Sequence, residues 1–310
     1  MGAGSRVSNT LVEVSELLVF FVAGFAASLV DGALGMGFGP TSASILLGGG
    51  LSPSAISTTV NLAKVATGLT AALSHWRFDN IDRRLVRRLA APGCVGALLG
   101  VTVLASVDGD RLKPILSLLL LVMAGRILLR FSRVVGPRGE VEGGPDQPPE
   151  LRGTAAVALA GGVTNGLVGA WGPVVTPFLL QRGMLPRYAI GSVNTAEVAV
   201  AVVASGSLLV SVGGGGIDVG VVAAMLLGGV LAAPLAAWSI RLLPARAMGV
   251  GVGGLLFVTN IRELMSAADV GPLRWVAYGA VAVACALAGA RPHLARPRVV
   301  PPAVPPLPSP

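Results

Sequence analysis

The sequence has 310 residues, of which 53% are hydrophobic and only 12% are charged. An ordinary soluble domain is roughly 25% charged, so this composition excludes a water-soluble fold and predicts an integral membrane protein. The formal net charge of +8 does not indicate a nucleic-acid partner, because the arginines lie mainly in short loops, where they set orientation in the membrane.

Charge-free runs long enough to cross a bilayer recur along the chain. No Asp, Glu, Lys or Arg occurs in residues 89–107, 154–181, 198–216 or 219–240. About 20 apolar residues are needed to cross a hydrocarbon core of roughly 30 Å. A cleavable signal peptide is the alternative for the stretch 17–34, but Glu13 and Glu16 precede it where a basic region is expected. We therefore expect several membrane crossings.

The first apolar segment, 17–49, follows an N-terminal segment of residues 1–16 and is interrupted in its middle. Residues 35–40 are rich in glycine, which tolerates unusual backbone conformations, and end in a proline, which lacks an N–H donor. They predict a broken helix that lines a substrate site, with tight helix packing as the alternative. Asp31 precedes the break, where its carboxylate could relay protons or orient the backbone.

Helices are predicted next at 54–76, 89–105 and 114–131, which completes a first membrane unit at 17–131. On the first of these helices Asn61 and Lys64 are three residues apart, so they share one face. An ionised group in the middle of a membrane costs on the order of 3 kcal/mol, so Lys64 is expected to be paired or functional.

The same order of elements then recurs. A Gly/Pro-rich charged stretch, 132–153, is predicted to be a cytoplasmic linker. The second membrane unit is expected at 154–264, with a broken segment at 154–181 and helices at 188–210, 219–240 and 247–264. An extra transmembrane helix within 265–290 and a proline-rich, disordered tail at 291–310 complete the chain.

Two landmarks support an internal repeat. Residues 31–40 match 165–173, and residues 57–64 match 190–197, so Asn61 and Lys64 correspond to Asn194 and Glu197. Chance similarity between two glycine-rich apolar stretches is the alternative.

Loop charges predict that the two copies are inverted. The stretch 77–88 carries five arginines, whereas its counterpart 211–218 has none, and the bias is reversed between 48–53 and 181–187. Equivalent loops then lie on opposite sides of the membrane. The predicted fold is an all-α integral membrane protein with two inverted-topology repeats. Each repeat has a broken, re-entrant helix pair and three transmembrane helices, which places residue 80 inside the cell and residue 214 outside. The alternative counts each broken segment as a single crossing, which would put the arginine-free stretch 211–218 in the cytoplasm.

The candidate site lies between the two breaks. Asp31 and Glu197 are candidates for proton or ion coupling, and Lys64 and Glu197 could instead pair with each other across the pseudo-symmetry axis. Two cysteines, Cys94 and Cys285, indicate neither a disulfide framework nor a zinc site, and no cofactor, metal or catalytic group is predicted. The predicted substrate-binding residues are Gly37, Gly39, Pro40, Asn61, Lys64, Gly172, Pro173, Asn194 and Glu197.

The motifs at 31–40, 57–64, 73–82, 169–173, 187–197 and 232–237 make the chain similar to a known family. From about residue 20 to 264 it resembles the sulfite exporter TauE/SafE family of bacterial membrane permeases. The resemblance implies a plasma-membrane transporter of small, often sulfur-containing anions such as sulfite or sulfonates. Relatives usually carry an acidic residue at the position of Lys64 and often His at that of Asn61, so this lysine favours direct attraction of an anion.

The resulting hypothesis is a secondary transporter that moves a small anion by alternating access in the bacterial plasma membrane. One alternative is an intramembrane enzyme that uses Asp31, Lys64 and Glu197. Against it, the sequence has no metal-ligand cluster and no Gly-x-Ser-x-Gly motif. A membrane scaffold is the other alternative, for which a sizeable soluble loop is expected and none is present.

Overall fold

The computed structural model describes residues 17–29, 31, 36–132, 152–212, 218–239 and 245–267, with the single positions 276, 279, 280 and 283. Within those residues the fold is all-helical and contains no strand, which confirms the predicted class at that level. The segment 1–16, the linker from 133 to 151 and the tail 291–310 lie outside the described residues. The same holds for the predicted helix 265–290 beyond Ala267, apart from the single positions.

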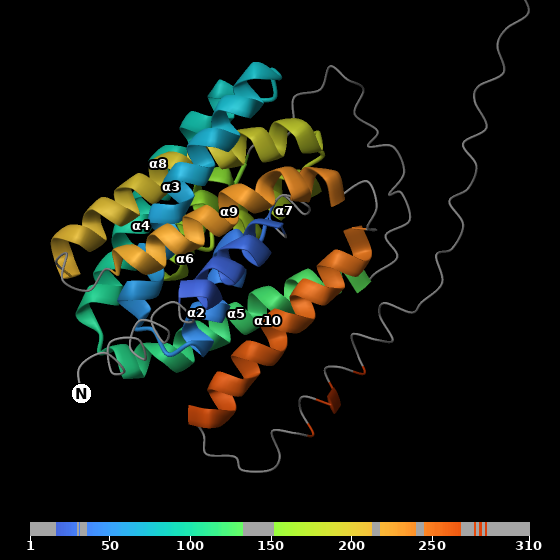
Figure 1. Ribbon diagram of the computed structural model, residues 1–310. Helices are drawn as coiled ribbons and strands as arrows, with labels where there is room; N and C mark the ends of the chain where they lie inside the picture. Colours follow the sequence, from blue (N-terminus) through green and yellow to red (C-terminus); the bar gives the residue numbers. More distant parts are fainter. Residues whose placement is uncertain are drawn as a thin grey trace, which may run out of the picture.

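The helices follow the predicted order along the chain (Figure 1). They are Leu17–Leu29, α2 (Phe38–Gly48), α3 (Pro53–Arg77), α4 (Arg83–Ser106), α5 (Gly109–Ser132), α6 (Thr154–Val168), α7 (Gly172–Gln181), α8 (Pro186–Val212), α9 (Val219–Ser239) and α10 (Ala245–Ala267). Each of the two segments predicted to be broken, 17–49 and 154–181, contains two separate helices.

Helix α4 begins earlier than the predicted 89–105, and the interpretation of 77–88 as a loop is wrong. The carboxylate of Asp82 accepts hydrogen bonds from the N–H groups of Arg84 at 2.8 Å and Leu85 at 3.1 Å. A short acidic side chain here satisfies N–H groups that have no partner inside the helix. The arginines from Arg83 onward therefore stand on the first turns of α4, and the connection shrinks to 78–82.

The same cap recurs at the start of α9. Asp218 accepts from the N–H groups of Gly220 at 2.8 Å and Val221 at 3.1 Å, which reproduces the pattern at Asp82. Helices α4 and α9 therefore begin with the same local chemistry.

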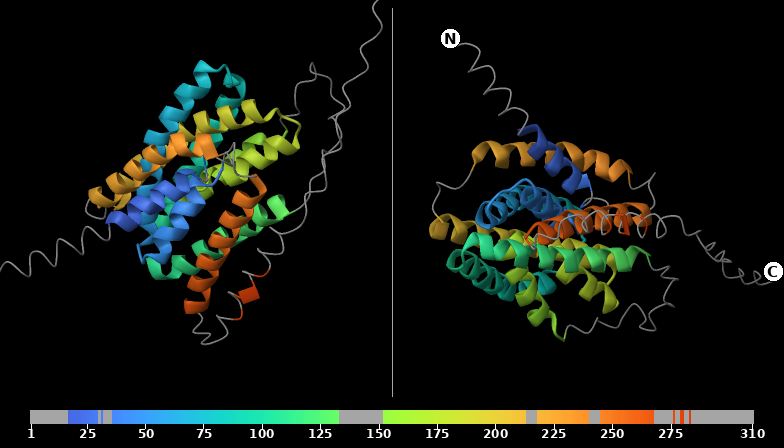
Figure 2. Two further views of the ribbon diagram at one scale, coloured as in Figure 1. Left: turned by 45° about the vertical axis from the view of Figure 1, so that its right-hand side comes forward. Right: turned by 90° about the horizontal axis from the view of Figure 1, so that it is seen from below.

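Glycines let two helix pairs pack with their backbones in contact. In the pair α4 and α6, a Cβ added at Gly96 would overlap the carbonyl of Leu159. In the pair formed by Leu17–Leu29 and α9, a Cβ added at Gly24 would overlap the backbone of Met225. Such close approach is what small residues permit between membrane helices. The right-hand view of Figure 2 shows these two pairs on opposite sides of the molecule.

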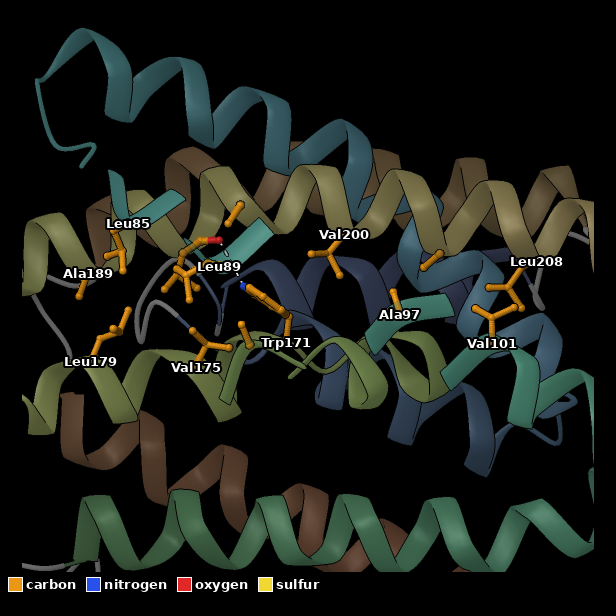
Figure 3. Close-up of a cluster of buried hydrophobic side chains, with 14 of the residues drawn as sticks. Leu85, Leu89, Ala97, Val101, Trp171, Val175, Leu179, Ala189, Val200 and Leu208 are labelled. Carbon is orange, nitrogen blue, oxygen red and sulfur yellow. Dashed lines mark hydrogen bonds between the residues drawn. The ribbon is translucent and has the colours of Figure 1, made fainter. Parts of the chain in front are cut away.

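The long helices α3 and α8 pack against each other, as do α5 and α10, so helices from the two halves of the chain are packed together. A buried apolar cluster fills the space between α4, α6, α7 and α8 (Figure 3). Trp171 lies near its centre, between Val175 and Val200, and is fully buried. Burial of a tryptophan contributes a large apolar area to a core.

Three helices among the described residues are long and apolar enough to cross a membrane: Arg83–Ser106, Gly109–Leu129 and Tyr188–Ser211. Large apolar side chains on these helices point outward, including Leu98 and Val103 on α4 and Leu118 and Val122 on α5, which are about half exposed. An outer surface of this kind fits a lipid environment.

Candidate functional site

The two helix breaks meet in the interior. A Cβ added at Gly39, in the first turn of α2, would overlap the carbonyl oxygen of Gly169, which follows α6. A Cβ added at Gly172 would lie 3.4 Å from Cβ of Met36. The two breaks therefore pack against each other, with Gly39 against Gly169 and Gly172 close to Met36.

The predicted binding residues at the breaks lie at these helix starts. Gly37 is the residue before α2 and has φ 153°, which favours glycine. Gly39, Pro40, Gly172 and Pro173 are buried in the first turns of α2 and α7, where a missing proline N–H breaks no helical hydrogen bond.

Lys64 on α3 lies at this meeting point. Its ammonium donates a hydrogen bond to the carboxylate of Glu197 on α8 and another, of 2.5 Å, to the carbonyl oxygen of Gly169. The two charged side chains are 8% and 16% exposed, so the ion pair is largely shielded. The alternative in which Lys64 and Glu197 pair with each other is the arrangement found here.

Two glycines allow this contact. Gly169 has φ 70°, and a Cβ there would overlap the side chain of Val60, so only glycine presents its carbonyl to Lys64 without strain. Gly68, one turn after Lys64, lies so close to Val198 that an added Cβ would be 3.1 Å from it. The close approach of α3 and α8 brings the lysine within reach of Glu197.

Asp31 lies on the other side of the first break from α2. Its carboxylate accepts a hydrogen bond of 3.1 Å from the N–H of Phe38, the first residue of α2. An acidic group at a helix N-terminus is favoured by the helix dipole. The charges of Asp31, Lys64 and Glu197 lie within electrostatic range of one another, so three ionisable groups from separate helical segments form one cluster.

Asn61 faces the second break rather than the ion pair. Its amide nitrogen donates to the carbonyl oxygen of Asn165 at 3.1 Å, and the amide nitrogen of Asn165 donates to Asn61 Oδ1 at 2.7 Å. Both residues are fully buried. The hydroxyl of Ser57 donates to the carbonyl of Gly166 at 2.7 Å. Helix α3 thereby adds side-chain donors to carbonyl groups at the end of α6, where the carbonyl of Asn165 also accepts from the N–H of Gly169.

Asn194, the counterpart of Asn61 in the second half, has a different environment. Its side chain is partly buried, and it makes no hydrogen bond with the residues that the structure describes. The structure therefore brings Asp31, Lys64 and Glu197 together, assigns Asn61 to a structural contact, and leaves the amide of Asn194 available.

Three residues of this region were missed by the sequence reasoning. Asn165 and Ser57 bond across the two halves, and the indole nitrogen of Trp171 donates to the carbonyl oxygen of Val193 at 3.2 Å (Figure 3). Asn165 occupies the position that Asp31 holds in the first copy, so the repeat alignment contained a signal for it. No sequence pattern indicated that the indole of Trp171 or the hydroxyl of Ser57 would form these hydrogen bonds. Within the described ranges, no three His, Cys, Asp or Glu side chains lie together as a metal site.

Comparisons with known proteins identify related membrane transporters. The family described as Sulfite exporter TauE/SafE matches residues 20–263. The probable membrane transporter protein YtnM of Bacillus subtilis (strain 168) is 38% identical over 273 residues, which cover 86% of this chain and 90% of that protein. No solved structure matches the chain.

Proposed function

This chain belongs to the sulfite exporter TauE/SafE family and is a membrane transporter, and we propose that it carries a small anion, sulfite or a sulfonate, across the bacterial plasma membrane. The observation that carries this proposal is the position of Lys64 where the two helix breaks meet. A buried ammonium held by a displaceable partner is suited to an anion.

In this proposal the substrate competes with Glu197 for Lys64. Removing an ionised group from water is unfavourable unless it is paired, so Lys64 needs a counter-ion in every state of the cycle. Glu197 is the counter-ion of the empty site, and the sulfur-centred oxyanion is the counter-ion of the loaded one. The carbonyl of Gly169 supplies a second acceptor that holds the ammonium in place.

Charge balance supports coupling to protons through Asp31 and Glu197. The cluster holds two carboxylates and one ammonium, so an added anion would face an excess of negative charge when all three groups are ionised. Like charges in a weakly screened site repel strongly. Uptake of a proton by a carboxylate would relieve that repulsion, so anion binding is expected to weaken as the pH rises.

The remaining predicted residues shape the wall of the proposed site. Gly37, Gly39, Pro40, Gly172 and Pro173 set where α2 and α7 start, and helix N-termini favour negative charge. Asn194, whose amide is available, is assigned to the substrate, while Asn61 positions the opposite wall through Asn165.

Alternating access is proposed to use two inverted repeats, each with a re-entrant helix pair. The corresponding caps at Asp82 and Asp218 support the repeat, and so do the two glycine-packed pairs on opposite sides of the molecule. Under this topology the protein crosses the membrane several times, with the arginines at the start of α4 on the cytoplasmic side. Relative movement of the repeats would expose Lys64 to each side in turn.

Flux of labelled sulfite into proteoliposomes tests the function, with an organosulfonate as a second substrate. Wild-type protein is expected to raise flux above that of empty liposomes, and Lys64→Ala and Glu197→Ala are expected to abolish the increase. Undiminished flux in both variants would show that the central site is misplaced.

Topology has a separate test in a variant without native cysteines. A cysteine at residue 80 is expected to react only with reagents on the cytoplasmic side, and one at residue 214 only with reagents outside. Labelling of both positions from the same side would exclude inverted repeats.

A further inference from the structure

A groove of about 650 Å³ lies between the second half of α3, the start of α4 and Thr195 on α8, and none of the residues assigned to the central site lines it. The turn between α3 and α4 forms the projecting upper end of the molecule in Figure 1. Most of the groove surface is apolar, and its charged residues are Arg83 and Arg87.

The apolar wall comes from one stripe of α3. Leu69, Leu73 and Trp76 are three or four residues apart, so they lie on one helix face, and they are 49%, 59% and 62% exposed. In a membrane protein, exposed leucines at this spacing face the hydrocarbon. An exposed tryptophan near a helix end is typical of the boundary between hydrocarbon and headgroups.

The two arginines stand one turn apart on α4 at the edge of the groove. Both side chains are exposed, and neither forms an ion pair with a residue in the described part of the chain. Two unpaired guanidinium groups next to an apolar surface fit a ligand that has a phosphate at one end and a hydrocarbon chain at the other. Arginine binds phosphate through two parallel hydrogen bonds.

We propose that this groove binds an anionic phospholipid, with the phosphate on Arg83 and Arg87 and an acyl chain along Leu69, Leu73 and Trp76. A small hydrated anion on its way to Lys64 would have to shed water against leucine side chains, which is unfavourable. The proposed orientation in the membrane decides only which leaflet supplies the lipid. In that orientation it is the inner leaflet, where arginine-rich regions meet anionic headgroups.

Native mass spectrometry of the purified full-length protein tests the proposal without measuring transport. Delipidated protein is mixed with equal amounts of phosphatidylglycerol and phosphatidylcholine that have the same acyl chains. Wild-type protein is expected to retain phosphatidylglycerol preferentially. Each basic residue near an anionic lipid contributes to the binding free energy. The variant Arg83→Gln/Arg87→Gln should therefore show a preference for phosphatidylglycerol that is reduced about 30-fold.

The matched control is Arg84→Gln/Arg88→Gln, which removes the same charge from another face of α4 outside the groove and should keep the preference. A second variant, Ala72→Trp, fills the groove without changing charge and should reduce retention of both lipids. The proposal would be overturned if the two double arginine variants lost the preference for phosphatidylglycerol equally, or if Ala72→Trp retained both lipids as wild type does. Because no transport is measured, such a failure would leave the proposed function untouched.

Discussion

The two helix breaks lie against each other but differ in how they are held. The second break, between α6 and α7, is held by a paired set of amides, Asn61 and Asn165, and by the hydroxyl of Ser57. At the first break, the carboxylate of Asp31 accepts a hydrogen bond from the N–H of Phe38. On α8, the amide of Asn194 makes no hydrogen bond with the described residues.

The second break is therefore held by neutral hydrogen bonds, whereas the first break carries an ionisable group. Neutral amides at the second break satisfy backbone groups and fix its shape, since a buried polar group without a partner is costly. At the first break, the position aligned with Asn165 is held by the carboxylate of Asp31. The ammonium of Lys64 lies where the two breaks meet. Similar sequence motifs therefore give one wall joined to α3 by neutral amides and one wall that carries a carboxylate.

The largest effect is expected at the ion pair that joins the two regions. Lys64→Met should destabilise the protein by about 3–5 kcal/mol, because it leaves the carboxylate of Glu197 buried without a partner. Thermal unfolding of the detergent-purified protein measures this. The double variant Lys64→Met/Glu197→Met should recover most of the loss, because it removes both charges of the pair and leaves neither partner unpaired.

Lys113→Met provides the control for this experiment. Lys113 pairs with Asp110 at 3.0 Å on the surface, with side chains 38% and 87% exposed, so its loss should cost about 0–1 kcal/mol. A similar loss of stability in Lys64→Met and Lys113→Met would contradict the buried character of the central pair.

The contact between the breaks gives the second effect. Gly39→Ala places a methyl group on the carbonyl of Gly169, and overpacking of this kind costs about 1–3 kcal/mol. Gly48→Ala, at the far end of the same helix, meets nothing within 4 Å and serves as the matched control. If Gly39→Ala and Gly48→Ala unfold at the same temperature, the two breaks are not in contact.

The smallest effect compares the two asparagines. Asn165→Ala removes the partner of Asn61 and should cost about 1–3 kcal/mol of stability. Asn194→Ala breaks no hydrogen bond with the described residues, so its stability should stay within about 0.5 kcal/mol of wild type while sulfite affinity falls. A larger loss of stability in Asn194→Ala than in Asn165→Ala would contradict the structural role assigned to Asn165 and the binding role assigned to Asn194.

Much of this architecture follows from the sequence. The glycines and prolines predicted both helix breaks, because these residues change the backbone conformation directly. The alignment of the two motifs also placed Lys64 at the position that corresponds to Glu197. The start of α4 was predicted wrongly, because four arginines suggest a loop while the cap at Asp82 makes them helical. The Asn61–Asn165 contact depends on how helices from different halves cross, which hydrophobic periodicity along one helix does not specify.

Equilibrium binding of labelled sulfite tests the central claim most directly, because it asks whether Lys64 holds the anion. Wild-type protein should bind sulfite more tightly as the pH is lowered and take up protons from the buffer as it does so. The folded double variant Lys64→Met/Glu197→Met should bind none. Sulfite binding by this variant with wild-type affinity would contradict the account.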